Sequence, residues 1–222
     1  MGSTLWKRTC TALAVALLTL SGGYAHSVPA TPSDTMEQDI DAAVQGVDSF
    51  WKKHWSEYFT ETYSSPNVVG LYDGTATDAP TCDGQKLDAG NAYYCAPEDY
   101  LAWDTNLMAK GYQTGDVYVY FIVAHEWGHA VQNRLDVRLQ DVSNELQADC
   151  LAGVGLKGAE QDETIVFESG DDKELAQAIT SLSDELPWTE VGDHGSANQR
   201  INAFDKGVRE GVEGCLPLTA PR

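Results

Sequence analysis

Apolar side chains recur every three or four positions from Met36 to Tyr58, the spacing of one buried face on an amphipathic helix. Residues 31–34, Thr-Pro-Ser-Asp, precede this pattern and are typical of a helix start. The same face carries several aromatic residues, namely Phe50, Trp51, Trp55 and Tyr58. The pattern therefore predicts a long first helix whose aromatic stripe packs into a hydrophobic core.

The segment after this helix has the composition of loops and short strands. Residues 64–90 are rich in Ser, Pro, Gly, Asp and Thr, which favours loops, and one short strand is predicted at 68–72. Residues 92–95 and 100–103 alternate around a turn at Ala96-Pro97-Glu98 and predict two further strands. We therefore expect a small β-containing insert.

Helical patterns return in the second half of the chain. The strongest covers residues 115–135, where Asp116 is the expected N-cap and an almost continuous apolar run at 117–124 predicts a buried helix. Further helices are expected at 142–155, 172–186 and 196–211, with a loop at 155–170. The whole pattern predicts a mainly helical protein of the α+β class.

The first thirty residues have the three-part layout of a secretory signal peptide. Lys7 and Arg8 precede an apolar run at 11–20, and small residues then allow cleavage after Ala25, Ser27 or Ala30. The run is shorter than the ~20 residues that span a bilayer, so a stable membrane anchor is not expected. We expect a secreted, extracellular protein with a signal peptide at 1–30 and a single domain at 31–222.

Charge excludes one class of partner. The 222 residues include 14 Lys and Arg against 34 Asp and Glu, which gives a net charge of −20. Removal of residues 1–30, which contain Lys7, Arg8 and no acid, would change this to −22. Nucleic-acid binding needs a basic surface, and no cluster of Lys or Arg supplies one, so no nucleic-acid partner is expected.

The cysteines predict two disulfides. Cys10 lies in the expected signal peptide, which leaves four cysteines in an exported chain. Three pairings are possible, and free thiols are the alternative. Proximity in sequence favours Cys82–Cys95, which leaves Cys150–Cys215. In the chain-entropy model, such bridges would contribute about 3 and 4 kcal/mol.

The helix expected at 115–135 contains His125-Glu126-Trp127-Gly128-His129, an H-E-x-x-H pattern. Residues four apart lie one turn apart on the same helix face, so both imidazoles can bind one metal ion. Glu126 projects about 100° away from His125 around the helix axis, where a general base for a metal-activated water would lie. Three polar core residues with ordinary partners are the alternative, but burying them without a metal would be costly.

Two histidines are too few for a catalytic zinc, which usually has three protein ligands and one open position. Glu145 and Asp149 lie four apart on the next expected helix, and a helical hairpin would bring that helix back against the first. Glu145 could bind the metal, and Asp149 could accept the second ring N–H of a ligand histidine. Two solvated carboxylates are the alternative, which the apolar neighbours of this pair disfavour.

His194 is the other candidate for the third ligand. Ser196 and Gln199, just after it, have the spacing of a capping box at the start of the last helix, which explains them without a function. His194 could bind zinc or donate a hydrogen bond to an oxyanion. We prefer the donor role because Glu145 already fills the third position.

The blocks HEWGH, ELQADC and HGSANQR, together with YYCAPEDYLAWD and the Trp-bearing first helix, resemble the neutral zinc metallopeptidase family of bacteria. The matching blocks span about residues 44–215. The resemblance implies a zincin-like helical core and a zinc-dependent peptidase, with His125 and His129 as ligands and Glu126 as base. Glu145 as third ligand and Asp149 as its support follow the broader zincins, whose third ligand is a Glu in an E-x-x-x-D helix.

The sequence therefore predicts a secreted metallopeptidase with one Zn²⁺ ion that acts on peptides or proteins, as an endopeptidase. The alternative is a zinc-stabilised binding module of the cell envelope without turnover. The complete set of ligands and base favours the enzyme, because a structural zinc site needs neither Glu126 nor an open position. No pattern in the sequence predicts an oligomeric state.

Overall fold

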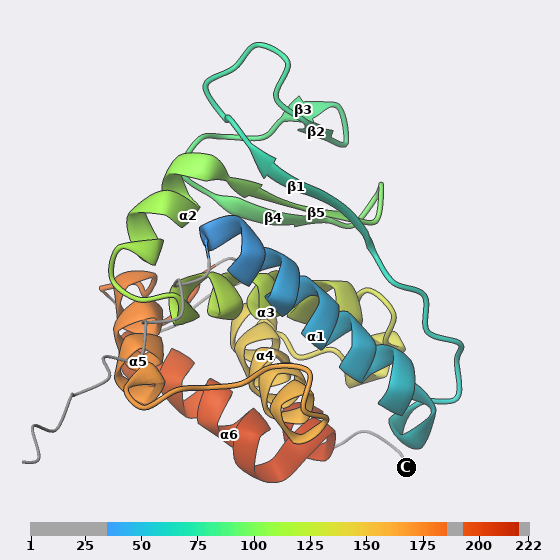
Figure 1. Cartoon of the computed structure of the whole chain (residues 1–222). Helices are drawn as coiled ribbons and strands as arrows, with labels where there is room; N and C mark the ends of the chain where they lie inside the picture. The colour runs from blue at the N-terminus through green and yellow to red at the C-terminus, as the bar shows by residue number, and fades with distance from the viewer. Residues whose placement is uncertain (1–34, 186–192, 218–222) are drawn as a thin grey trace, which may run out of the picture. The chain divides into compact units, whose positions relative to one another are not determined.

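Helices dominate the molecule, and one small sheet lies against them (Figure 1). The computed structural model describes residues 35–185 and 193–217, so the expected signal peptide at 1–30 and the expected helix start at 31–34 lie outside the described residues. The described part has six α-helices and five short strands. The predicted mainly helical α+β class is confirmed.

Helix α1, Met36–Tyr58, carries the predicted aromatic stripe into the core. It begins after Thr35, whose hydroxyl accepts a hydrogen bond from the Gln38 N–H while the Gln38 side chain bonds back to the Thr35 N–H. This capping box fixes the first turn of the helix. Phe50, Trp51 and Trp55 are buried, whereas Tyr58, the last residue of the stripe, is exposed.

Three strands form one sheet in the order β1-β5-β4. They match the three predicted strands and span Asn67–Tyr72 (β1), Ala92–Cys95 (β4) and Tyr100–Asp104 (β5). Strand β5 is central and buried, and it pairs parallel with β1 and antiparallel with β4. Strand β4 is therefore an edge strand. A separate pair, β2 (Thr81–Cys82) and β3 (Gln85–Lys86), was not predicted, since two-residue strands show no periodicity.

Helix α2, Thr105–Tyr112, also falls outside the sequence prediction. It follows β5 directly, and the buried Asp104 side chain accepts hydrogen bonds from the N–H groups of Asn106 and Leu107. The second Asp104 oxygen accepts from the Gly74 N–H. The cap was readable from the sequence, but eight residues give too short a pattern to predict a helix.

Helices α3 and α4 form the centre of the core. The predicted buried helix is α3, Val117–Gln132, and it begins after Asp116 as expected. Helix α4 spans Asn144–Gln161, so the loop predicted from residue 155 is wrong over its first seven positions. Glycines favour a helix end, but a Cβ on Gly158 would overlap the Phe50 ring. This glycine instead lets α1 approach α4.

The last two helices differ from the prediction mainly at their ends. Helix α5 spans Asp171–Ser181 and stops before the predicted end at 186, a position outside the described residues. Helix α6, Ala197–Cys215, begins with the predicted capping box of Ser196 and Gln199. It was expected to end at Gly211. There the backbone leaves helical geometry with φ of 66°, and one further turn continues to Cys215.

Both predicted disulfides are present. Cys82–Cys95 joins β2 to β4, and Cys150–Cys215 joins α4 to the end of α6. The insert is therefore stapled as predicted, and the C-terminal turn is tied to the helix that carries Glu145.

Glycines at the α4–α6 contact lead to a stability prediction. A Cβ on Gly207 would overlap the Cys150 carbonyl oxygen. Although alanine is the better helix former, Gly207→Ala should lower the free energy of unfolding by about 1–3 kcal/mol, because neither backbone can move freely. Urea denaturation measures the change. Asn202→Ala, at an exposed position of α6, is the matched control and should stay within about 0.5 kcal/mol of the parent. Equal losses in both variants would contradict the packing argument.

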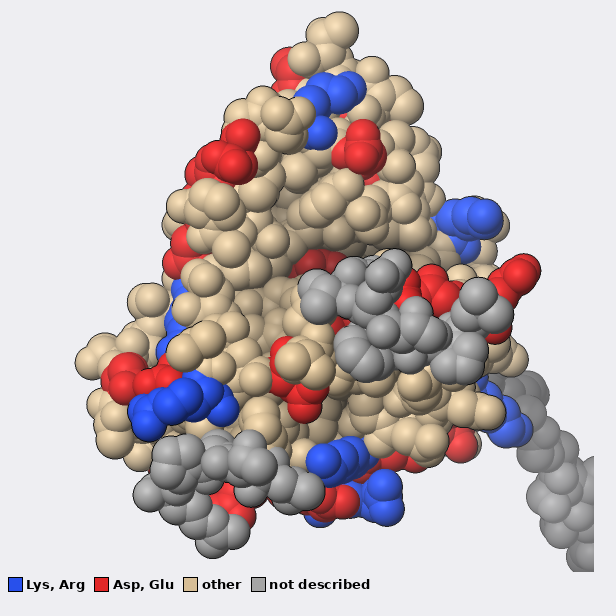
Figure 2. Space-filling view, turned by 180° about the vertical axis from the view of Figure 1, so that it is seen from behind, with Lys and Arg blue, Asp and Glu red and all other residues tan. Residues whose placement is uncertain are grey.

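The surface carries the negative charge of the chain. On the face shown in Figure 2, Lys and Arg side chains lie in separate groups between Asp and Glu, and they do not merge into a broad basic area. Among the residues that the structure describes, no helix has the length and apolar character needed to cross a membrane.

Candidate metal centre

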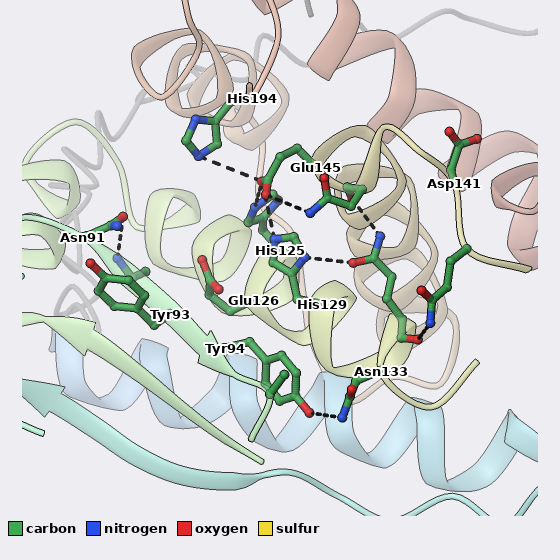
Figure 3. A pocket seen from close by; sticks show the side chains of 15 residues that line it. Asn91, Tyr93, Tyr94, His125, Glu126, His129, Asn133, Asp141, Glu145 and His194 are labelled. Carbon is green, nitrogen blue, oxygen red and sulfur yellow. Dashed lines mark hydrogen bonds and ion pairs between the residues drawn. The ribbon is translucent and has the colours of Figure 1, made fainter. Parts of the chain in front are cut away.

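The histidines of α3 and the acids of α4 face one another between the two helices (Figure 3). The connection at residues 133–143, with one 3-10 turn at Val137–Leu139, turns the chain back as the predicted hairpin requires. Gly128 lies where the helices approach, and a Cβ there would overlap the Ala148 carbonyl oxygen. The glycine inside the HEWGH block thus brings Glu145 within reach of both histidines.

Three ligand atoms converge at this point. The Glu145 Oε2 atom lies 3.2 Å from His125 Nε2 and 3.4 Å from His129 Nε2. Zinc bonds of ~2.0–2.1 Å at tetrahedral angles would separate the ligand atoms by about 3.3 Å. The three atoms lie within 4.8 Å of one another, and two imidazoles with one carboxylate are donors that zinc accepts. His125, His129 and Glu145 could therefore hold a zinc ion.

His125 is oriented by a buried ion pair. Its Nδ1 lies 2.8 Å from Asp149 Oδ1, so Nδ1–H donates to the carboxylate and Nε2 faces Glu145. Arg200 of α6 holds Asp149 in turn, with Nε 2.9 Å from Oδ2 and Nη2 2.8 Å from Oδ1. Asp149 is completely buried and Arg200 is 2 % exposed. The carboxylate thus lies where the sequence places it, in contact with the histidine.

The ionisation of these groups reflects their contacts with one another. Burial lowers the pKa of His125, but hydrogen bonds to Asp149 and Glu145 outweigh it and raise this pKa to about 9. Burial raises the pKa of Glu145, but the two imidazoles hold it well below its ordinary value. Asp149 keeps a lowered pKa despite its burial, because Arg200 and His125 donate to it. The Glu145 and Asp149 carboxylates are therefore ionised and carry the negative charge that attracts a cation.

His129 is oriented by an amide instead of an acid. Its Nδ1 lies 2.8 Å from Gln132 Oε1, one turn further along α3. Gln132 in turn donates to the Asn144 carbonyl and to Gln147 Oε1. Both glutamines are buried. His125 and His129 consequently both direct Nε2 towards Glu145.

Glu126 lines the cavity beside the three ligand atoms, and its carboxylate points into this space (Figure 3). The cavity has a volume of about 500 Å³. Among the described residues, no hydrogen bond or ion pair holds the Glu126 side chain, which is 7 % exposed. An acid so placed has its oxygens available to a water or a substrate in the cavity.

His194 reaches the same cavity from the segment before α6. Its Nε2 lies 3.9 Å from Glu145 Oε2, and its Nδ1 lies 3.8 Å from Asp184 Oδ1. Asp184 also accepts hydrogen bonds from the N–H groups of His194 and Gly195, which fixes the backbone at this point. The side chain is about half exposed and lies outside the three-residue cluster.

Three residues of this centre were not predicted from the sequence, namely Gln132, Gln147 and Arg200. Arg200 stands in the HGSANQR block, and a buried acid such as Asp149 needs a cationic partner. A cation beside Asp149 could therefore be predicted from the sequence. The sequence does not show which Lys or Arg residue supplies it. The glutamines carry no signal in the sequence, because an uncharged amide on a helix is usually a surface residue.

Comparisons with known proteins agree with these features. A family model described as "Putative neutral zinc metallopeptidase" matches residues 23–215. The chain is 28 % identical over 193 residues to "Uncharacterized protein YpfJ" of Escherichia coli, covering 71 % of this chain and 63 % of that protein. It is 29 % identical over 202 residues to "Uncharacterized protein Rv2575" of Mycobacterium tuberculosis, covering 77 % and 66 %.

The chain thus spans less than two thirds of the length of the Escherichia coli relative. No solved structure matches it. The family model covers most of the chain, and the matched range includes every residue of the centre from His125 to Arg200. This chain belongs to the neutral zinc metallopeptidase family.

Proposed function

We propose that the protein is a secreted zinc metallopeptidase that hydrolyses peptide bonds within peptides or proteins. The observation that carries the proposal is the convergence of three metal-binding side chains and the unpaired Glu126 carboxylate on one cavity. A purely structural zinc site would have four protein ligands and no need of a free acid. One Zn²⁺ ion bound by His125, His129 and Glu145 would leave a position open for water.

Zinc in this position would lower the pKa of a water towards ~7 and polarise the substrate carbonyl. Glu126 takes the proton of the attacking water and passes it to the nitrogen of the leaving amine. His194 donates a hydrogen bond to the oxyanion that develops on the former carbonyl. Asp149 and Gln132 keep both imidazoles in the tautomer that directs Nε2 to the ion.

The edge strand β4 suggests how a peptide would bind. Asn91, Ala92, Tyr93 and Tyr94 line the cavity. Strand β4 pairs with β5 along one edge, and no strand of the described residues pairs with its other edge. An extended peptide can add to such an edge through backbone hydrogen bonds, which are independent of its sequence. This arrangement favours an internal stretch of a polypeptide as substrate, which is the basis for proposing an endopeptidase.

A smaller cavity adjoins the first and shares His125, Glu126 and His194 with it. It has a volume of about 110 Å³, and its lining includes Leu107, Phe121, Ile122 and Leu182. Apolar walls beside the reacting groups would receive an apolar side chain of the substrate next to the cleaved bond.

Two disulfides and the expected signal peptide support export, because disulfides persist in oxidising compartments. Zinc would then be bound, and the substrate met, outside the cytoplasm.

Metal analysis of the purified chain together with a peptide-cleavage assay tests the proposal. We expect one zinc per chain and cleavage of unstructured peptides that stops with a chelator and returns with zinc. Glu145→Ala should weaken zinc binding by at least about 10- to 100-fold, the loss seen when a supporting partner of a ligand is removed.

Glu160→Ala, on the same helix but away from the cavity, is the matched control and should bind zinc like the parent. Bound zinc without cleavage of any peptide in a broad library would favour the zinc-stabilised binding module. Unchanged zinc binding in Glu145→Ala would show that Glu145 is not the third ligand.

A further inference from the structure

We propose that Gln132 and Gln147 are positioning residues for the ligand His129, and that the Cys150–Cys215 disulfide anchors the far end of their hydrogen-bond chain. Zinc affinity would then depend on this disulfide. The inference rests on the proposed zinc site and adds a contact between that site and the C-terminal turn of the molecule.

Backbone carbonyls fix the orientation of both amides, because a carbonyl oxygen can only accept. Gln132 Nε2 lies 2.7 Å from the Asn144 carbonyl oxygen, so the NH₂ group of Gln132 faces that side. Its Oε1 must then face His129, 2.8 Å from Nδ1. His129 therefore donates through Nδ1–H, and its Nε2 has the lone pair that a metal needs.

Gln147 is fixed in the same way. Its Nε2 lies 2.8 Å from the Leu139 carbonyl oxygen and 3.0 Å from that of Cys215, which uses both N–H bonds. Its Oε1 accepts from Gln132 Nε2 at 3.0 Å and from the Asp141 N–H at 3.0 Å. Each hydrogen-bonding position of Gln147 is filled, and the side chain is 3 % exposed.

The chain of hydrogen bonds thus runs from His129 through Gln132 and Gln147 to the Cys215 carbonyl. A rotation of either amide would place two acceptors or two donors face to face, so the four groups are ordered together. Gln132 and Gln147 come from α3 and α4, and Cys215 ends α6, so the chain links three helices near the metal ligands.

The disulfide holds the last member of this chain. Cys215 ends the turn that follows the break in α6 at Gly211, where the helix itself no longer fixes the carbonyl. Its bond to Cys150 ties that turn to α4, one turn beyond Gln147 on the same helix. Without the bond, the Cys215 carbonyl could leave Gln147, and the order of both amides would loosen.

Zinc affinity, measured by competition with a chelator and without any peptide, tests this proposal. Gln132→Met should weaken zinc binding by about 10- to 100-fold, because His129 loses its acceptor. Gln147→Met acts one contact further from His129 than Gln132 does, and the double change Cys150→Ala and Cys215→Ala acts two contacts further. Each of these two variants should weaken zinc binding by about three- to tenfold. The double change Cys82→Ala and Cys95→Ala is the matched control and should leave zinc affinity unchanged.

A double-mutant cycle separates positioning from general loosening of the fold. In the Gln132→Met background, removing the Cys150–Cys215 bridge should have no further effect on zinc affinity, because the chain is already broken. Additive losses would overturn the proposal, as would unchanged affinity in Gln147→Met. The latter variant retains both disulfides and decides the question if the bridge variant does not fold. Absence of zinc binding in the parent would instead contradict the proposed function.

Discussion

Replacing Glu126 by Gln should leave zinc bound and reduce peptide hydrolysis by at least about 100-fold. A positioned general base contributes about 10²- to 10⁴-fold, and glutamine has the same shape but cannot take the proton. Because no partner within the described residues holds the Glu126 side chain, the change should disturb neither the fold nor the three metal ligands. Zinc content, thermal stability and the rate of peptide cleavage are the three measurements.

The matched control for this prediction is Glu210→Gln, which makes the same chemical change at an exposed position of α6. It should retain the full rate. If Glu126→Gln with bound zinc still cleaved peptide at the parental rate, the assignment of the base would be wrong. Loss of zinc in this variant would instead place Glu126 among the residues that support the metal.

The sequence predicted those parts of the centre that lie on one helix or follow a strong local pattern. Helical spacing alone places His125 and His129 on one face, and the four-residue spacing of Glu145 and Asp149 does the same on α4. Their meeting required only a hairpin between two adjacent helices. The two disulfides followed from an even number of cysteines and their separation along the chain.

What the sequence did not predict depends on contacts between distant segments. Helix α4 continues through Gly158, which lies against Phe50 of α1, and no local rule contains this contact between distant segments. Gln147 looks like any helical glutamine in the sequence, but in the fold two backbone carbonyls, one backbone N–H and the Gln132 amide surround its side chain. Arg200 shows the same limit, because its partner Asp149 lies on another helix, 51 positions earlier.

Replacing Arg200 by Met should lower the free energy of unfolding by about 3–5 kcal/mol. The guanidinium makes a two-point contact with Asp149, and both side chains are almost completely buried. Methionine keeps an unbranched apolar side chain in place of the arginine stem. It leaves the Asp149 carboxylate charged in the interior without its cation, and an uncompensated buried charge is costly. The Leu182 carbonyl would also lose its donor. Urea denaturation of the metal-free protein measures the loss.

Arg209→Met, at an exposed position of the same helix, is the matched control and should change stability by less than about 0.5 kcal/mol. Arg200→Lys should fall between the two, because lysine keeps the charge but cannot make both contacts in one plane. Asp149 also accepts from His125, so Arg200→Met should weaken zinc binding as well as folding. A variant that lost stability but bound zinc like the parent would show that Asp149 orients His125 without help from Arg200.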